Sequence, residues 1–133
     1  METIGLLAGI GTLPVEFIEA VRPQGYRVVC IAVTPGVDPR LAAIADAYYD
    51  ISAFKLDKVI KTLVKEHVKE VTMIGKVTKE LLFSGKVQPD ARMLKLIMEL
   101  PDRKDDTIMM MFVRELAKAG IQAFDQTALI RRL

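Results

Sequence analysis

A glycine turn near the N-terminus is the first stretch whose residues suit ligand binding. Residues 6–14 read LLAGIGTLP, an apolar run that breaks at Gly9, Ile10 and Gly11. Glycines let a ligand approach the backbone closely, and the amides of a first helical turn attract anions. The hydroxyl of Thr12 suits either a helix cap or a phosphate contact. The stretch therefore predicts a phosphate or nucleotide site, and a turn of purely structural purpose is the alternative.

The generic dinucleotide fingerprint is incomplete in this turn. It requires a third glycine where the chain has Pro14, and an acidic residue at the end of the second strand, where the chain has Thr34-Pro35-Gly36. We therefore do not expect NAD to bind.

A second turn, rich in lysine, follows a later apolar run. Residues 75–79 read GKVTK, and two lysines with a threonine suit a diphosphate as point charges and a hydroxyl donor. The carboxyl ends of parallel strands meet in one crevice at the point where the strand order reverses. We therefore predict that Gly75, Lys76 and Lys79 lie near the glycine turn, with ordinary solvated lysines as the alternative.

Other residues of chemical interest do not complete a catalytic set. Asp105 and Asp106 stand at a predicted helix start, where capping and the helix dipole explain acidic residues, although paired carboxylates also suit Mg²⁺. The single histidine, His67, leaves no zinc cluster, and the single cysteine, Cys30, lies in an apolar run typical of burial. The sequence thus predicts a binding crevice without a reaction centre.

Short apolar runs alternate with segments of helical period, which is typical of parallel strands joined by crossover helices. We expect a doubly wound, mostly parallel α/β sheet of about five strands with helices on both faces. The expected strands are 3–8, 26–33, 47–51, 70–74 and 122–124, and the expected helices are 13–22, 38–45, 56–67, 90–100 and 105–119.

The last of these helices contains six successive apolar residues, IMMMFV at Ile108–Val113. An apolar surface that wraps most of a helix needs cover on a second side, and flexible methionines suit an adaptable contact. Three alternatives remain for what packs against this second side: the ordinary core around a deeply buried helix, an absent domain, or a second subunit in a homodimer through this helix.

The composition excludes several classes of protein. The 133 residues suffice for one domain, and the net charge of +2 gives no reason to expect a nucleic-acid partner. The start of the chain has no signal-like segment and no apolar run reaches the length of a membrane span. We expect a cytoplasmic protein.

Several stretches, taken in order, resemble one known family. LLAGIGTLP at Leu6–Pro14, GKVTKELLF at Gly75–Phe83, the Asp105-Asp106 pair and the closing Gly120-Ile121 are similar to the N-terminal domain of the LpxI family. These enzymes are the UDP-2,3-diacylglucosamine pyrophosphatases of lipid A biosynthesis. The likeness covers essentially the whole chain and implies a Rossmann-like domain at residues 1–124. It also implies that residues 125–133 begin a linker to a C-terminal catalytic domain absent from this chain.

The resemblance implies a hydrolase of Gram-negative-type bacteria. The family cleaves its UDP-sugar lipid substrate, with Mg²⁺, to UMP and lipid X at the cytoplasmic face of the inner membrane. Its essential aspartate lies in the C-terminal domain, so no catalytic residue and no bound cofactor is expected in this chain, and the metal ligands stay unassigned. The implied substrate-binding residues are Gly9, Ile10, Gly11, Thr12, Gly75, Lys76, Lys79 and Asp106. Lys104 departs from the family pattern, which has a glycine before the paired aspartates.

Three hypotheses follow for function. The first is the substrate-binding domain of an LpxI-like pyrophosphatase, inactive when isolated. The second is a free-standing nucleotide-binding or dimerisation module without catalysis. The third is a chain in which the glycine turn is only architecture and binds nothing.

Overall fold

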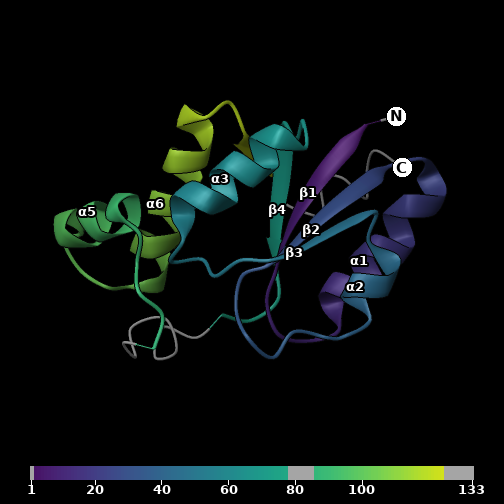
Figure 1. Cartoon of the computed structure of the whole chain (residues 1–133), viewed down its shortest axis with the longest axis horizontal. Helices are drawn as coiled ribbons and strands as arrows, with labels where there is room; N and C mark the ends of the chain where they lie inside the picture. The colour runs from purple at the N-terminus through teal and green to yellow at the C-terminus, as the bar shows by residue number, and fades with distance from the viewer. Residues whose placement is uncertain (1, 78–85, 125–133) are drawn as a thin grey trace.

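The computed structural model describes residues 2–77 and 86–124. The sequence predictions for Lys79 and for residues 125–133 therefore lie outside the described residues. The core is a sheet of five parallel strands, in the order β3-β2-β1-β4-β5 (Figure 1). The strands are β1 (Thr3–Ala8), β2 (Arg27–Ala32), β3 (Ala47–Asp50), β4 (Glu70–Ile74) and β5 (Gln122–Ala123).

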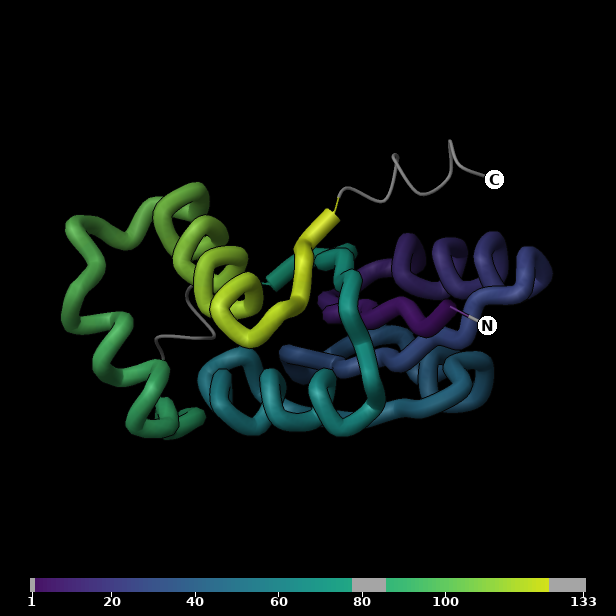
Figure 2. Tube along the Cα trace, turned by 90° about the horizontal axis from the view of Figure 1, so that it is seen from above, coloured from purple at the N-terminus to yellow at the C-terminus, as the bar shows by residue number. Residues whose placement is uncertain are grey.

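The helices cover both faces of the sheet, as the sequence pattern predicted. On one face lie α1 (Leu13–Val21), followed by the 3₁₀ turn η1 (Arg22–Gln24), and α2 (Leu41–Ile44); the other face carries α3 (Leu56–Lys65), α5 (Ala91–Glu99) and α6 (Asp105–Lys118). In Figure 1, α1 and α2 lie to the right of the strands and α5 and α6 to the left; Figure 2 also has α5 and α6 at the left and α1 at the right. The predicted doubly wound α/β fold is thus confirmed.

The strand order creates the crevice that such folds use for ligands. The chain runs from β1 outward to β2 and β3, then returns to the other side of β1 to form β4 and β5. The connections after β1 and β4 therefore leave the sheet toward opposite faces, so the crevice between them lies at the carboxyl ends of these two strands.

Two predicted helices differ by more than one residue from their bounds in the structure, and the other three by one residue at one or both ends. The expected helix 38–45 begins only at Leu41, because the Asp38 carboxylate accepts a hydrogen bond from the backbone N–H of Arg40, at 3.0 Å, in a local turn. The expected helix 56–67 ends at Lys65, and exposed His67 has a positive φ of 62°. Short polar side chains and helix ends compete locally with the helical ladder, which a periodicity argument does not detect.

The apolar core lies on both faces of the sheet. Leu6, Cys30 and Ile18 belong to the cluster under α1, while Val29 and Leu63 belong to the cluster under α3 and α6. Cys30 is fully buried, as expected, and desolvation raises the pKa of its thiol to about 12. No helix within residues 2–77 and 86–124 combines the length and apolar character needed to cross a bilayer.

The methionine-rich part of α6 divides between core and surface. Ile108 and Met111 are buried, whereas Met109 is 46% and Met110 52% exposed. The sheet therefore covers one side of α6, and the outer methionines are only about half covered by the described residues. A contact of this side with another domain or a second subunit stays a prediction.

Candidate functional site

The two turns singled out in the sequence are joined by hydrogen bonds. The backbone N–H of Ile10 donates to the carbonyl of Lys76 at 2.9 Å, and the N–H of Lys76 donates back to the carbonyl of Ile10 at 2.9 Å. The N–H of Gly9 donates to the carbonyl of Ile74 at 2.8 Å. The structure thus places Lys76 directly beside the glycine turn, at the carboxyl ends of β1 and β4.

Gly9 and Gly75 are required by this close approach of two backbones. A Cβ on Gly9 would lie 2.7 Å from the carbonyl oxygen of Lys76, and a Cβ on Gly75 would lie 2.6 Å from the carbonyl carbon of Gly9. Gly75 also has a φ of +103°, which side chains rarely adopt. Gly9 is thus required for the contact with the second turn, and its contact with a ligand stays a prediction.

The backbone amides without a hydrogen-bond partner among the described residues lie further along the chain than Gly9. Those of Gly9, Ile10 and Lys76 all donate within the protein, as given above. By contrast, the amides of Gly11, Thr12 and Leu13 meet no acceptor among the described residues, and the Thr12 side chain forms no cap. The anion-attracting groups are therefore those at the first turn of α1, where the helix dipole adds to the amide charges.

An apolar cavity of about 360 Å³ lies beside the paired turns. Its floor is the carboxyl end of the sheet, with Leu7 and Met73, and its walls come from α3 and α6. Among the described residues, its charged lining consists of Lys76 and Asp105. The sequence analysis did not find this cavity, because it depends on the separation of α3 and α6, which are far apart in the chain. The apolar run at Ile108–Val113 was its only sequence signal.

The remaining predicted residues lie around these features. Gly9, Gly75 and Lys76 line the cavity, and Gly11 and Thr12 are exposed at the start of α1. Of the paired aspartates, Asp105 lines the cavity, whereas Asp106 is exposed and is not part of the lining. Lys79 lies outside the described residues.

The described residues contain no cluster of three metal-ligating side chains. Across residues 2–77 and 86–124, no three side chains of His, Cys, Asp or Glu converge closely enough to hold a metal ion. Asp105 and Asp106 are only two carboxylates, and Mg²⁺ held by so few side chains takes its other ligands from waters and substrate phosphates. We therefore derive no chemical step through a metal in this part of the chain.

Comparison with known proteins agrees with this architecture. The family model of the LpxI N-terminal domain matches residues 3–133. The chain belongs to this family. It is 30% identical over 125 residues to the UDP-2,3-diacylglucosamine pyrophosphatase LpxI of Caulobacter vibrioides, an alignment that covers 92% of this chain and 43% of that protein. The chain thus spans less than half the length of the curated relative it matches.

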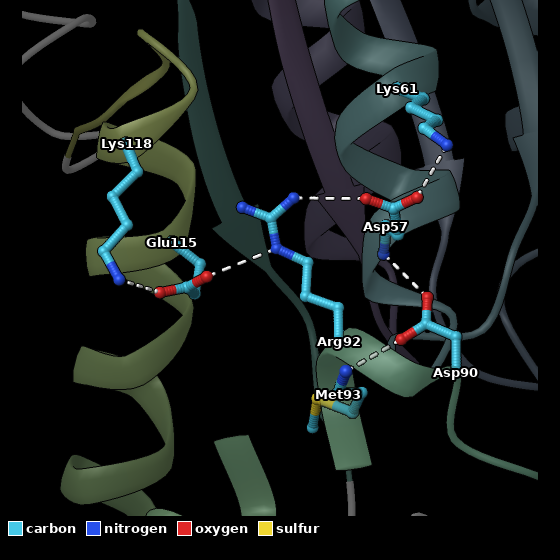
Figure 3. Close-up of polar contacts among 7 residues, drawn as sticks. All are labelled: Asp57, Lys61, Asp90, Arg92, Met93, Glu115 and Lys118. Carbon is cyan, nitrogen blue, oxygen red and sulfur yellow. Dashed lines mark hydrogen bonds and ion pairs between the residues drawn. The ribbon is translucent and has the colours of Figure 1, made fainter. Parts of the chain in front are cut away.

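In this LpxI N-terminal domain, a network of charged side chains holds α6 in place as a wall of the cavity. Arg92 on α5 lies between two carboxylates, with Nε 3.2 Å from Glu115 on α6 and a terminal nitrogen 3.2 Å from Asp57 on α3 (Figure 3). Lys118 is 2.7 Å from the other oxygen of Glu115. Because Glu115 is buried, its charge depends on these partners.

The same network fixes the start of α5. Asp90 accepts hydrogen bonds from the backbone N–H of Met93, at 2.8 Å, and from that of Asp57, also at 2.8 Å (Figure 3). One carboxylate thus caps α5 and ties it to the first turn of α3. Lys61 pairs with Asp57 one helical turn away, at 2.8 Å.

These contacts determine the charge state of the network. Hydrogen bonds from Lys118 and then Arg92 hold the pKa of Glu115 below its usual value, against the effect of burial. Lys61, followed by Arg92, lowers the pKa of Asp57 in the same way. Both groups are therefore carboxylates at neutral pH, and the network is a structural clamp rather than a proton-transfer site.

Proposed function

We propose that this chain is the substrate-binding domain of an LpxI-type enzyme and holds a lipid-linked UDP-sugar at the carboxyl edge of its sheet. The observation that carries the proposal is the joining of the two turns through Ile10 and Lys76. This joint sets Lys76, which lines the apolar cavity, beside the glycine turn that leads into α1.

The arrangement suits a ligand with an anionic part and an aliphatic part. The amides of Gly11, Thr12 and Leu13 and the ammonium group of Lys76 would neutralise and orient a diphosphate. The neighbouring cavity, lined by residues such as Leu7, Met73 and Phe112, would remove part of an acyl chain from water. The substrate named for the Caulobacter relative, UDP-2,3-diacylglucosamine, carries both parts.

Within this proposal, the chain binds and orients substrate and the rest of a longer enzyme breaks the bond. Among the described residues, no three His, Cys, Asp or Glu side chains converge on a possible metal site. We therefore expect the chain of 133 residues to hydrolyse no UDP-2,3-diacylglucosamine, with or without Mg²⁺. Release of UMP by the purified chain would contradict this division of labour. We place the complete enzyme in the cytoplasm at the inner membrane, where such a lipid is accessible.

Calorimetric titration of the purified chain tests the binding proposal. UMP, a UDP-sugar and lipid X are titrated into the wild-type protein and into a Lys76→Ala variant. The control is Lys69→Ala, because Lys69 is an exposed lysine just before β4, at the opposite edge of the sheet. We expect Lys76→Ala to weaken the binding of all these phosphorylated ligands about three- to tenfold, as loss of a charge-assisted contact implies.

The outcome separates the parts of the proposal. Equal weakening by Lys69→Ala would reveal only a general effect of charge, and no weakening by Lys76→Ala would remove this residue from the site. Tighter binding of lipid X than of glucosamine 1-phosphate is expected if the cavity accepts an acyl chain. Equal affinities would show that the cavity is not used. No binding of any of these ligands would favour the view that the glycine turn is only architecture.

A second candidate, a dimerisation module, is favoured by one observation. Met109 and Met110 are exposed on α6 although both are large apolar side chains. Sedimentation of the wild-type chain and of a Met109→Lys/Met110→Lys variant tests it, because a dimer through α6 would dissociate in the variant. A wild-type monomer at all concentrations would exclude this candidate.

A further inference from the structure

Thr34 is a buried polar residue with an unsatisfied side chain. It is 3% exposed, and its hydroxyl oxygen has no hydrogen-bond partner among the described residues. A hydroxyl removed from water without a partner costs free energy, so such groups are rare in folded proteins. A buried hydroxyl without a partner, close to a proposed binding site, therefore suggests that a bound ligand supplies its hydrogen-bond partner.

The position of Thr34 places it at the same edge as the proposed site. It follows β2 by two residues, and the N–H of the preceding Val33 still donates to the carbonyl of Ala8 in β1, at 3.1 Å. Side chains alternate between the two faces along a strand. Val29, Ile31 and Val33 belong to the cluster on the α3 face, and Val28 and Cys30 to the cluster on the α1 face. Thr34 is next in this alternation, from which we infer that its side chain lies on the α1 face.

This face is where α1 begins. The helix has nine residues, and the amides of its first turn, at Gly11, Thr12 and Leu13, meet no acceptor within the described chain. Two independent features thus occur at the carboxyl ends of β1 and β2. The unpaired amides at the start of α1 suit an anionic phosphate, and the unpaired hydroxyl of Thr34 suits a neutral hydrogen-bonding group.

A sugar hydroxyl is the group that fits Thr34 best. In doubly wound nucleotide-binding folds, the phosphate lies on the first turn of the first helix, and a side chain at the end of the second strand contacts a ribose hydroxyl. A threonine hydroxyl both donates and accepts, as a ribose hydroxyl does. We propose that Thr34 hydrogen-bonds a ribose hydroxyl of a nucleotide whose phosphate lies at the start of α1. This inference rests on the proposed function and assigns the nucleotide end of the ligand to this side of the crevice.

The Ile10 side chain lies against the turn that follows Thr34. A Cβ built on Gly36, two residues beyond Thr34, would lie 3.6 Å from Cδ1 of Ile10, so the Ile10 side chain lies over this turn. Ile10 is 38% exposed, which leaves it room to rotate toward solvent. Its backbone is held by the pair of hydrogen bonds to Lys76, so only the side chain has to move.

Titration of three ligands into three forms of the purified chain tests the inference. The ligands are UMP, 2′,3′-dideoxyuridine monophosphate and inorganic phosphate, and the proteins are wild type, Thr34→Val and the matched control Thr34→Ser. Thr34→Val removes the hydroxyl with little change in shape, whereas Thr34→Ser retains it. We expect Thr34→Val to weaken UMP binding about three- to tenfold, the equivalent of one neutral hydrogen bond, and Thr34→Ser to preserve it.

The other ligands separate the ribose contact from the phosphate contact. Inorganic phosphate should bind all three proteins equally, and the dideoxy nucleotide should bind wild type and Thr34→Val with the same reduced affinity. The dideoxy comparison with wild-type protein needs no variant, so it stands even if a variant fails to fold. Equal binding of UMP and its dideoxy analogue to wild type would overturn the inference.

Two further outcomes would also overturn it. If wild type and Thr34→Val bind UMP equally well, the inference is wrong and the proposed function stands. If wild type binds lipid X but not UMP, the ribose contact does not exist in this half of the enzyme. In the absence of ligand, Thr34→Val should be at least as resistant to urea as wild type, and a clear loss would show that the hydroxyl already has a partner inside the protein.

Discussion

The joint between the two turns predicts a steep and position-specific cost for adding a methyl group. Gly9→Ala and Gly75→Ala each place a Cβ within 2.8 Å of backbone atoms of the other turn. Backbone cannot yield as a flexible side chain does, so the turns must separate or strain. Gly11→Ala is the matched control, because Gly11 shares the positive φ of Gly75 but has nothing within 4 Å of its built Cβ.

The magnitudes follow from two separate costs. Overpacking by a small group costs about 1–3 kcal/mol, which is the whole expected loss for Gly9→Ala. A left-handed backbone costs a residue with a Cβ about 1–2 kcal/mol, which is the whole expected loss for Gly11→Ala. Gly75→Ala incurs both, so the free energy of unfolding should fall by about 2–5 kcal/mol.

Urea unfolding followed by circular dichroism measures these losses, and amide hydrogen exchange at Ile10 and Lys76 localises them. Faster exchange at both amides is expected in Gly9→Ala and Gly75→Ala, because the two hydrogen bonds between the turns weaken together. The reasoning would be refuted if Gly11→Ala proved as costly as Gly75→Ala, or if Gly9→Ala unfolded like wild type with both amides still protected.

Three other predictions concern Arg92, Cys30 and the methionines of α6. Arg92→Met deprives buried Glu115 of one partner and should cost about 1–3 kcal/mol of unfolding free energy in urea titrations at neutral pH. Because its pKa is lowered in the folded protein, ionised Glu115 stabilises the fold at pH values above its usual pKa of 4.5. This contribution is lost as the pH falls through its lowered pKa. Arg92→Met should therefore make the free energy of unfolding depend less steeply on pH in the acid range. Cys30, with its pKa raised to about 12, should resist thiol reagents at pH 8 until the chain unfolds, as a spectrophotometric thiol assay would reveal. Met111→Ala should cost about 2–5 kcal/mol in thermal or urea unfolding, whereas Met110→Ala should stay within about 0.5 kcal/mol, as is usual for surface positions.

Much of the fold was predictable from local pattern. The nearly continuous apolar run at residues 26–33 predicted a central strand, and β2 is indeed buried between β1 and β3. Pro23 and Gly25 predicted the end of the first helix, which closes in a 3₁₀ turn at Gly25 with a φ of 97°. Predictions were less accurate at residues 38–45, because an aspartate turn replaced the first helical turn there.

The candidate site was predictable only in part. The crevice rule placed the turns after β1 and β4 together, and the backbone bonds between Ile10 and Lys76 show that they are in contact. It did not indicate which amides those bonds would occupy, because hydrogen bonding between segments 66 positions apart depends on their exact register. It also gave no sign of the unsatisfied hydroxyl of Thr34, which appears polar and ordinary in the sequence.

The sequence by itself determined the order of strands and helices, the family and the location of the two turns. These features depend on the local period of apolar residues and on glycine and proline, whose effects act within a few neighbours along the chain. Only the tertiary structure decided that Gly9 and Gly75 allow the two turns to come into close contact, that the unpaired amides begin at Gly11, and that α3 and α6 enclose a cavity. Each of these depends on the distance between backbones that are remote in sequence, and that distance is determined by the packing of the whole sheet and its helices.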